Sequence, residues 1–87
     1  MRSKNIYRFR FNAICPVDTS VIDEYDALIT SRDVIPVEKI LEAVKLLTKA
    51  PVFQEHITIK LALSLRAKVE TIGTHSGVLV KVIAKWK

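Results

Sequence analysis

The sequence predicts an α+β fold, in which a four-stranded antiparallel sheet carries two helices on one face. Apolar and polar residues alternate near both ends of the chain, which is typical of half-buried strands, whereas apolar residues in the middle recur at helical spacing. Proline and glycine residues separate several of these segments. The expected order is therefore β-β-α-α-β-β, in a single domain over residues 1–87.

The N-terminal part of the chain is expected to form a hairpin. Residues 6–14 alternate as one half-buried strand. Cys15 and Pro16 end this strand, and residues 17–23 are expected to form a loop. A weaker alternation over residues 24–32 should return as the hairpin partner. The face of the first strand that we expect to be buried carries Tyr7, Phe9, Phe11 and Ala13.

The central part is expected to form two helices. Apolar residues recur at helical spacing over residues 36–49, with Pro36 in the first turn and Pro51 beyond the end. Residues 52–72 fit both the helical and the strand period, and they are too long for one strand. We therefore assign a second helix near residues 52–66 and leave the remainder to a strand.

The C-terminal part is expected to form a second hairpin, with a strand near residues 67–74 and a turn from Gly73 to Gly77. A sheet built from two hairpins has two open edges and one face without helices. Self-association would cover them, so we expect a homo-oligomer with sites assembled between subunits. One face of the last strand carries Val78, Val80, Val82, Ala84 and Trp86.

Composition restricts the setting of the protein. With 49% hydrophobic and 26% charged residues, the chain is typical of a globular protein rather than a disordered one. It contains no run of eighteen apolar residues and no apolar signal core, so we expect no membrane association. One cysteine excludes an internal disulfide and, with two histidines, gives no zinc site of normal spacing. We therefore expect a cytoplasmic protein without a bound metal.

The distribution of charge indicates an anionic partner. The net charge is +5, and seven of the nine acidic residues fall within residues 18–42, which leaves both ends of the chain basic. Basic ends attract RNA through the release of counterions. The alternative is an ordinary solvated surface. The residues that we expect to contact RNA are Arg8, Arg10, Lys81 and Lys85.

Cys15 is the candidate nucleophile. It follows the first strand, Asp23 comes eight residues later, and Glu55 lies near the start of the second helix. A thiol with nearby acids suits addition to an electrophilic carbon, because the thiolate attacks and a carboxyl group supplies the proton. The other interpretations are a buried structural thiol, turn-forming aspartates and an acid that complements the helix dipole. We interpret His75, in the predicted turn, as structural.

Taken together, these features resemble the tunnelling-fold (T-fold) superfamily. The ββααββ order is combined with Cys15-Pro16-Val17 after the first strand, an aspartate soon afterwards, and Phe53-Gln54-Glu55 at the opening of the second helix. Within the superfamily the sequence resembles the 7-cyano-7-deazaguanine reductases (QueF), and it resembles their short archaeal QueF-like relatives more closely still. The latter are amidinotransferases that make archaeosine in transfer RNA. The resemblance covers residues 6–86.

The resemblance implies a role for each site residue. Cys15 matches the thiol that attacks the nitrile carbon of 7-cyano-7-deazaguanine to give a covalent thioimide, and Asp23 matches the aspartate that shuttles protons to the nitrile nitrogen. Glu55 matches the glutamate that binds the guanine-like edge, and Gln54 and His56 flank it. The implied function is a tRNA-modifying amidinotransferase that makes the formamidine of archaeosine, with ammonia as the amine donor.

The sequence departs from the family at three places. Its aspartate lies one residue later, Gln54 replaces the usual histidine with His56 on the other side of Glu55, and residues 37–41 keep only a trace of the NADPH motif of the reductases. The last departure argues against a reductase and predicts that no cofactor is needed. The alternatives are a purine- or pterin-binding T-fold protein without this catalysis and, third, an NADPH-dependent reductase.

Overall fold

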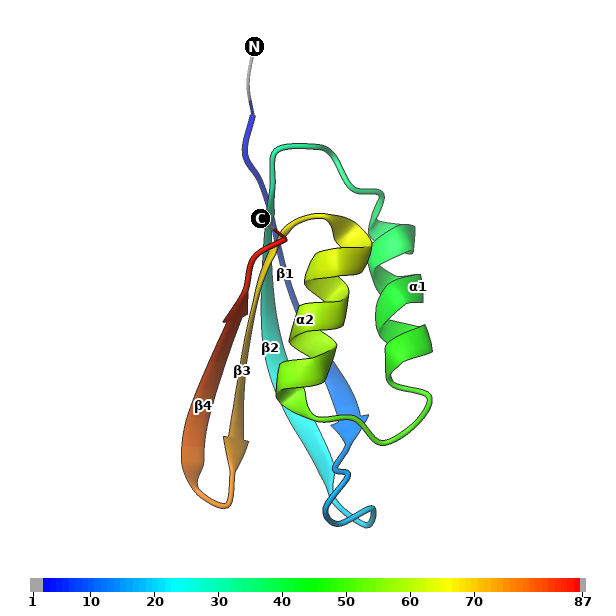
Figure 1. Ribbon diagram of the computed structural model, residues 1–87, viewed down its shortest axis with the longest axis vertical. Helices are drawn as coiled ribbons and strands as arrows, with labels where there is room; N and C mark the ends of the chain where they lie inside the picture. Colours follow the sequence, from blue (N-terminus) through cyan, green and yellow to red (C-terminus); the bar gives the residue numbers. More distant parts are fainter. Residues whose placement is uncertain (1–2, 87) are drawn as a thin grey trace.

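The computed structural model describes residues 3–86 and has the predicted order of six elements (Figure 1). The four strands form one antiparallel sheet in which each strand pairs with its neighbours in the sequence. This confirms the predicted α+β fold. The elements are β1 (Asn5–Ile14), β2 (Ile22–Ser31), α1 (Val37–Leu47), α2 (Gln54–Leu65), β3 (Lys68–His75) and β4 (Val78–Ala84).

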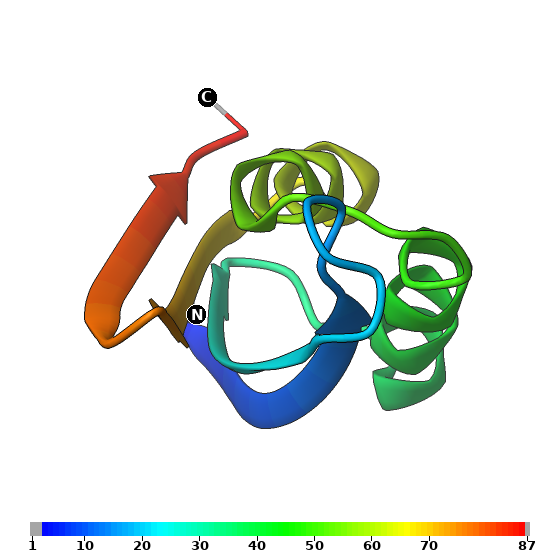
Figure 2. The same cartoon turned by 90° about the horizontal axis from the view of Figure 1, so that it is seen from below.

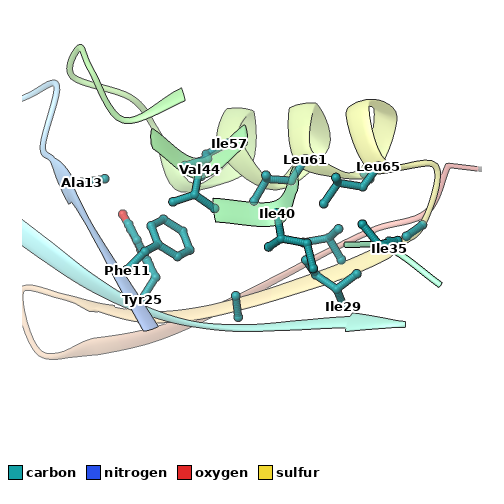
Figure 3. Packing of buried hydrophobic residues seen from close by; sticks show 14 residues of the cluster. Phe11, Ala13, Tyr25, Ile29, Ile35, Ile40, Val44, Ile57, Leu61 and Leu65 are labelled. Atoms are coloured by element: carbon teal, nitrogen blue, oxygen red, sulfur yellow. The ribbon is translucent and has the colours of Figure 1, made fainter. Parts of the chain in front are cut away.

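Both helices lie on the same side of the sheet, and the strands form a curved layer against them (Figure 2). The core fills the space between the two layers (Figure 3). Tyr25 and Ile29 from β2 and Ile57 and Leu61 from α2 are between 0% and 1% exposed. Each fully buried side chain of this kind contributes roughly 1.5–3 kcal/mol relative to an exposed one, so this contact is what holds α2 on the sheet.

The ends of α1 follow from backbone hydrogen bonding. Pro36 is the residue before the helix rather than part of its first turn, and its carbonyl oxygen accepts from Lys39 N–H at 3.0 Å and Ile40 N–H at 3.3 Å. At the other end, the N–H and the hydroxyl of Thr48 both donate to Val44 O, at 3.0 and 2.8 Å. The helix is therefore slightly shorter at both ends than the predicted range 36–49.

Helix α2 begins later and ends one residue earlier than the predicted range 52–66. Its C-terminal cap is Arg66, in the left-handed region with a φ of 52°. This geometry lets Ala67 N–H donate to Ala62 O at 3.2 Å, which satisfies a carbonyl at the end of the helix. Strand β3 then starts at Lys68.

The predicted loop over residues 17–23 is wrong at its end, because β2 begins at Ile22. Asp23 therefore lies on a strand, paired with Ala13 of β1. A strand position fixes the direction of its side chain more firmly than a loop would. The inward face of β2 starts with Asp23, and the alternation of exposed and buried residues along β2 continues from there.

The predicted turn from Gly73 to Gly77 is also wrong, since Gly73 lies inside β3 between Tyr25 of β2 and Val80 of β4. A Cβ atom at Gly73 would lie 2.4 Å from Cδ1 of Tyr25. The turn itself consists of Ser76 and Gly77, both with positive φ (51° and 84°). Two such residues are the pattern of a tight type I′ hairpin.

One end of the molecule brings together the end of β1, the start of β2, the start of α2 and the end of β3 (Figure 1). The residues predicted for catalysis and base binding lie in or next to these four segments. The opposite end holds the end of β2, the end of α2 and the end of β4. Neither helix in the described part of the chain is long and apolar enough to cross a membrane.

Candidate functional site

A hollow of about 390 Å³ lies at the end of the molecule where these four segments meet. Its size is within the usual range for sites that take small molecules. The residues that line it and can take part in chemistry are Cys15, Asp18, Asp23, Tyr25, Gln54 and His75. The structure thus brings together the predicted thiol and the predicted acid, which come from opposite ends of the β1–β2 connection.

The thiol of Cys15 is free and partly exposed. Its backbone N–H donates to Val21 O at 3.0 Å, which closes the loop between β1 and β2. On the other side, Ile14 O accepts from Val52 N–H at 3.2 Å, which ties this loop to the segment before α2. Cys15 is therefore held by backbone bonds on both sides while its side chain reaches the hollow.

Asp18 is a turn former. Its Oδ1 accepts from the backbone N–H of Ser20 at 3.0 Å and from the Ser20 hydroxyl at 2.6 Å. Both bonds favour the ionised carboxylate and lower the pKa of Asp18. Because its carboxylate is already engaged within the loop, Asp18 is a poorer candidate than Asp23 for moving a proton.

Asp23 is the acid that is enclosed by the site, with a side chain only 10% exposed. Its Oδ2 accepts from the Tyr25 hydroxyl at 3.4 Å, and its Oδ1 lies 3.8 Å from Nδ1 of His75. The tyrosine is 1% exposed, and burial raises its pKa above the ordinary value, with the negative charge of Asp23 and that of the Cys15 thiolate acting in the same direction. The phenol therefore stays protonated and acts as a donor.

His75 is the site residue that sequence reasoning missed. Its Nε2 lies 2.8 Å from Oε1 of Gln54 and 3.5 Å from the Tyr25 hydroxyl. The register of β2 and β3 is what could have predicted its role. Tyr25 pairs with Gly73, and continuing this antiparallel register by two residues puts Asp23 opposite His75. When Gly73 is assigned to a turn, the predicted pairing of β2 with β3 ends before it reaches Asp23 and His75. The contact between these two residues therefore cannot be predicted.

Gln54 is buried, and its amide is fully used inside the protein. Its Nε2 donates to Thr71 O at 3.1 Å, to Thr71 Oγ1 at 3.2 Å and to Val80 O at 3.0 Å. Its Oε1 faces His75. The side chain therefore links α2 to β3 and β4, and forms the wall of the hollow behind the histidine.

Glu55 and His56 lie outside the Cys15 hollow. Both are exposed, and they line a neighbouring hollow with Val80 and Val82 of β4. The ring of His56 stands edge-on to Phe53, with centroids 5.6 Å apart. A single chain therefore does not bring the predicted base-binding glutamate to the thiol, although the two hollows share the wall formed by Phe53, Gln54 and His75.

The residues predicted to contact RNA fall into two places. Arg8, Arg10 and Lys81 line a shallow hollow on the face of the sheet without helices. Arg10 pairs there with Asp26 at 2.8 Å and Lys81 with Glu70 at 3.2 Å. Lys85 lies at the far end of the molecule.

The far end carries a basic cluster of four residues, Arg32, Arg66, Lys68 and Lys85, which we call the far-end cluster. Within residues 3–86, none of its four cations forms an ion pair with a carboxylate, although Asp33 lines the same hollow. The guanidinium of Arg66 stacks on Trp86 at 5.7 Å. This cation–π contact belongs to the far-end cluster.

In the described part of the chain, histidine, cysteine and acidic residues form no group that could hold a metal ion.

Comparison with solved structures decides the fold. The crystal structure of an archaeosine synthase QueF-like protein in the apo form superposes with a TM-score of 0.84, over 94% of this chain and 91% of that chain. The chain therefore has the same fold as that protein, an α+β T-fold with the order ββααββ. The two sequences are 18% identical, so this likeness concerns the fold alone. No protein-family model matches the sequence, and no curated protein matches it either.

Proposed function

We propose that this T-fold protein is an amidinotransferase that converts the nitrile of 7-cyano-7-deazaguanine in tRNA to the formamidine of archaeosine. The observation that carries the proposal is that a partly exposed thiol, Cys15, and an enclosed acid, Asp23, line the same hollow at the end of the sheet. A nucleophile beside a proton donor is the minimum that addition to a nitrile requires.

The reaction follows from these two groups. The thiolate of Cys15 attacks the nitrile carbon, a C–S bond forms, and the nitrogen takes a proton from Asp23, which gives a thioimide. Ammonia then adds to the thioimide carbon and the C–S bond breaks. The product leaves as the amidinium cation and the thiolate is restored. No electrons are exchanged with another molecule, so no reductant is consumed.

A second copy of the chain completes the site. Glu55 suits the two N–H donors of a guanine-like edge, but it opens on the hollow beside β4 rather than on that of Cys15. The edge strands carry exposed apolar side chains, with Ile6 on β1 57% exposed and Leu79 on β4 70% exposed. Pairing between copies would cover these edges and bring Glu55 of one chain towards Cys15 of another.

Transfer RNA is the substrate that the charge favours. The far-end cluster presents four cations without carboxylate partners within residues 3–86, and phosphates neutralise such a surface at little cost. The cluster lies at the other end of β2 from Asp23, and a ten-residue strand spans roughly 33 Å. A substrate that contacts both ends must therefore be much larger than a free base.

Covalent capture tests the proposal. Incubated with free 7-cyano-7-deazaguanine, the protein should gain the mass of the base in an intact-mass measurement, and Cys15→Ala should not. Asp23→Asn should form the same adduct at least about tenfold more slowly, because a positioned acid contributes about two to four orders of magnitude to such steps. Asp18→Asn is the matched control and should react at close to the normal rate.

Three results would count against the proposal. An unchanged mass with excess base, under conditions that label a QueF reductase, would remove the nucleophile. Slow capture by Asp18→Asn but not by Asp23→Asn would show that Asp18, and not Asp23, supplies the proton. Consumption of NADPH in the presence of the base would make the protein a reductase.

A further inference from the structure

We propose that His75 is a positioning residue that stores the proton used by Asp23, and that the amide of Gln54 fixes which ring nitrogen faces the aspartate. The use of that proton rests on the proposed function. Its location rests only on the hydrogen bonds of this chain.

The orientation of the Gln54 amide is not arbitrary. Its Nε2 lies 3.1 Å from Thr71 O and 3.0 Å from Val80 O, and backbone carbonyls can only accept hydrogen bonds. The –NH2 group must therefore point to these two strands, and the carbonyl oxygen must point the other way. Gln54 is 6% exposed, so water does not offer its amide an alternative arrangement.

The amide then dictates the state of one nitrogen of His75. Nε2 of His75 lies 2.8 Å from Oε1 of Gln54, and this oxygen can only accept. Nε2 must therefore carry a hydrogen. A Tyr25 hydroxyl 3.5 Å from the same nitrogen is consistent with this, since its own hydrogen is directed to Asp23 Oδ2.

The other ring nitrogen, Nδ1, then faces the carboxylate of Asp23. A neutral imidazole has one N–H, so with Nε2 protonated its Nδ1 would present a lone pair to the carboxylate of Asp23, 3.8 Å away. Two lone pairs repel. A proton held between Nδ1 and Asp23 would turn this contact into an attraction, and this is the proton that we assign to the pair.

The position of this proton suits the first step of the reaction. As the Cys15 sulfur bonds to the nitrile carbon, the proton passes through Asp23 to the nitrile nitrogen. The product departs as a cation, so the pair is recharged by a proton from water. The separation of 3.8 Å is longer than a hydrogen bond, and catalytic contacts are often long in the absence of substrate and tighten when it is bound.

Nitrogen NMR of the histidine rings tests, without any substrate, whether Gln54 fixes the ring nitrogen of His75 that carries a hydrogen. The chain has two histidines, so His56→Gln assigns the spectrum. In the full-length protein with ¹⁵N-labelled rings at neutral pH, Nε2 of His75 should carry a hydrogen. A bare Nε2 with the hydrogen on Nδ1 would overturn the proposal.

Adduct formation tests the use of the proton. His75→Gln should slow capture of the free nitrile base by about tenfold or more while changing its dissociation constant little, because the loss concerns proton supply. Thr74→Ala, the neighbouring position on the opposite face of β3, should react normally. Capture by His75→Gln at the normal rate would overturn the proposal.

Asp23→Asn provides a second variant whose fold is easily checked. Its amide can donate to Nδ1, so the extra proton is no longer needed, and His75 should then show the neutral ring with Nε2–H. A doubly protonated ring in this variant would contradict the proposed pairing. If the wild-type protein captures no base at all, the proposed function fails, while the NMR result still decides whether Gln54 fixes the hydrogen on Nε2 of His75.

Discussion

At the scale of single residues, the position of the Tyr25 ring connects packing with chemistry. The ring passes over Gly73 of β3, where a side chain would collide with it, and this brings the hydroxyl to Asp23 and His75. The ring also packs at a tilt against the rings of His75 and Phe11, with centroids 5.7 and 5.4 Å apart. A glycine in the middle of a strand thus serves the site by leaving room for a tyrosine.

The first residue-scale prediction concerns Gly73→Ala. The added Cβ would lie within 2.4 Å of a ring that is 1% exposed, so Tyr25 must move. We expect the free energy of unfolding to fall by about 1–3 kcal/mol, the usual cost of overpacking, as measured by urea denaturation. Capture of the nitrile base should slow as well, because the Tyr25 hydroxyl loses its place beside Asp23.

Gly77→Ala is the control for this prediction. No atom lies within 4 Å of a Cβ built at Gly77, but its φ of 84° makes alanine strained. It should therefore cost about 1 kcal/mol through backbone strain alone and leave the Tyr25 contacts intact. Equal effects of the two variants on capture would contradict the argument from Tyr25.

At the scale of elements, the start of α2 separates two tasks between adjacent residues. Gln54 and Thr58 face the sheet, where Thr58 Oγ1 is 2.6 Å from both Gln54 O and Thr71 Oγ1. Glu55, one residue along, faces outwards. Consecutive residues of an α-helix are separated by about 100° around the helix axis, so the side chains of Gln54 and Glu55 cannot point in the same direction.

The element-scale prediction is complementation between two inactive variants. If Glu55 of one chain binds the base that Cys15 of another chain attacks, the Cys15→Ala and Glu55→Gln variants should each be inactive towards tRNA when assayed separately. Mixed and reassembled in equal amounts, they should regain up to about one quarter of the normal activity, because random pairing of chains restores that share of complete sites. An inactive mixture, despite reassembly confirmed by native mass spectrometry, would place both residues in one chain's site.

At the scale of the whole molecule, the arrangement of charge separates cations that are already paired from cations that are not. Arg10 and Lys81, on the sheet face without helices, lie beside Asp26 and Glu70. The far-end cluster has no such partners within residues 3–86. A phosphate that approaches a paired cation must compete with the carboxylate, so the far end should contribute more to RNA binding.

The whole-molecule prediction follows from counterion release. The affinity for tRNA, measured by fluorescence anisotropy over a series of salt concentrations, should fall steeply with salt. Replacing both Lys68 and Lys85 by alanine should reduce the log–log slope by about two, close to one unit per lost phosphate contact. Replacing both Arg10 and Lys81 should change it less. The opposite ranking would place the RNA on the face of the sheet.

The sequence by itself determined the order of the six elements and the layer in which the helices lie. Both depend on periodicity within short segments, where alternation and helical spacing are read directly from neighbouring residues. It also singled out Cys15 and Asp23, because a lone thiol with an acid soon afterwards is a local pattern. Element ends were less certain, since capping by Pro36 and Thr48 depends on how the chain closes its hydrogen bonds.

Only the tertiary structure decided which side chains meet. The contact between Tyr25 and His75 joins residues 50 positions apart, and it exists because Gly73 continues β3 beyond the point where its sequence suggests a turn. The same register places Asp23 on a strand facing His75, while the rotation of α2 turns Glu55 away from Cys15. Such contacts arise from the pairing of strands and the packing of layers, and these depend on free energies that no single segment contains.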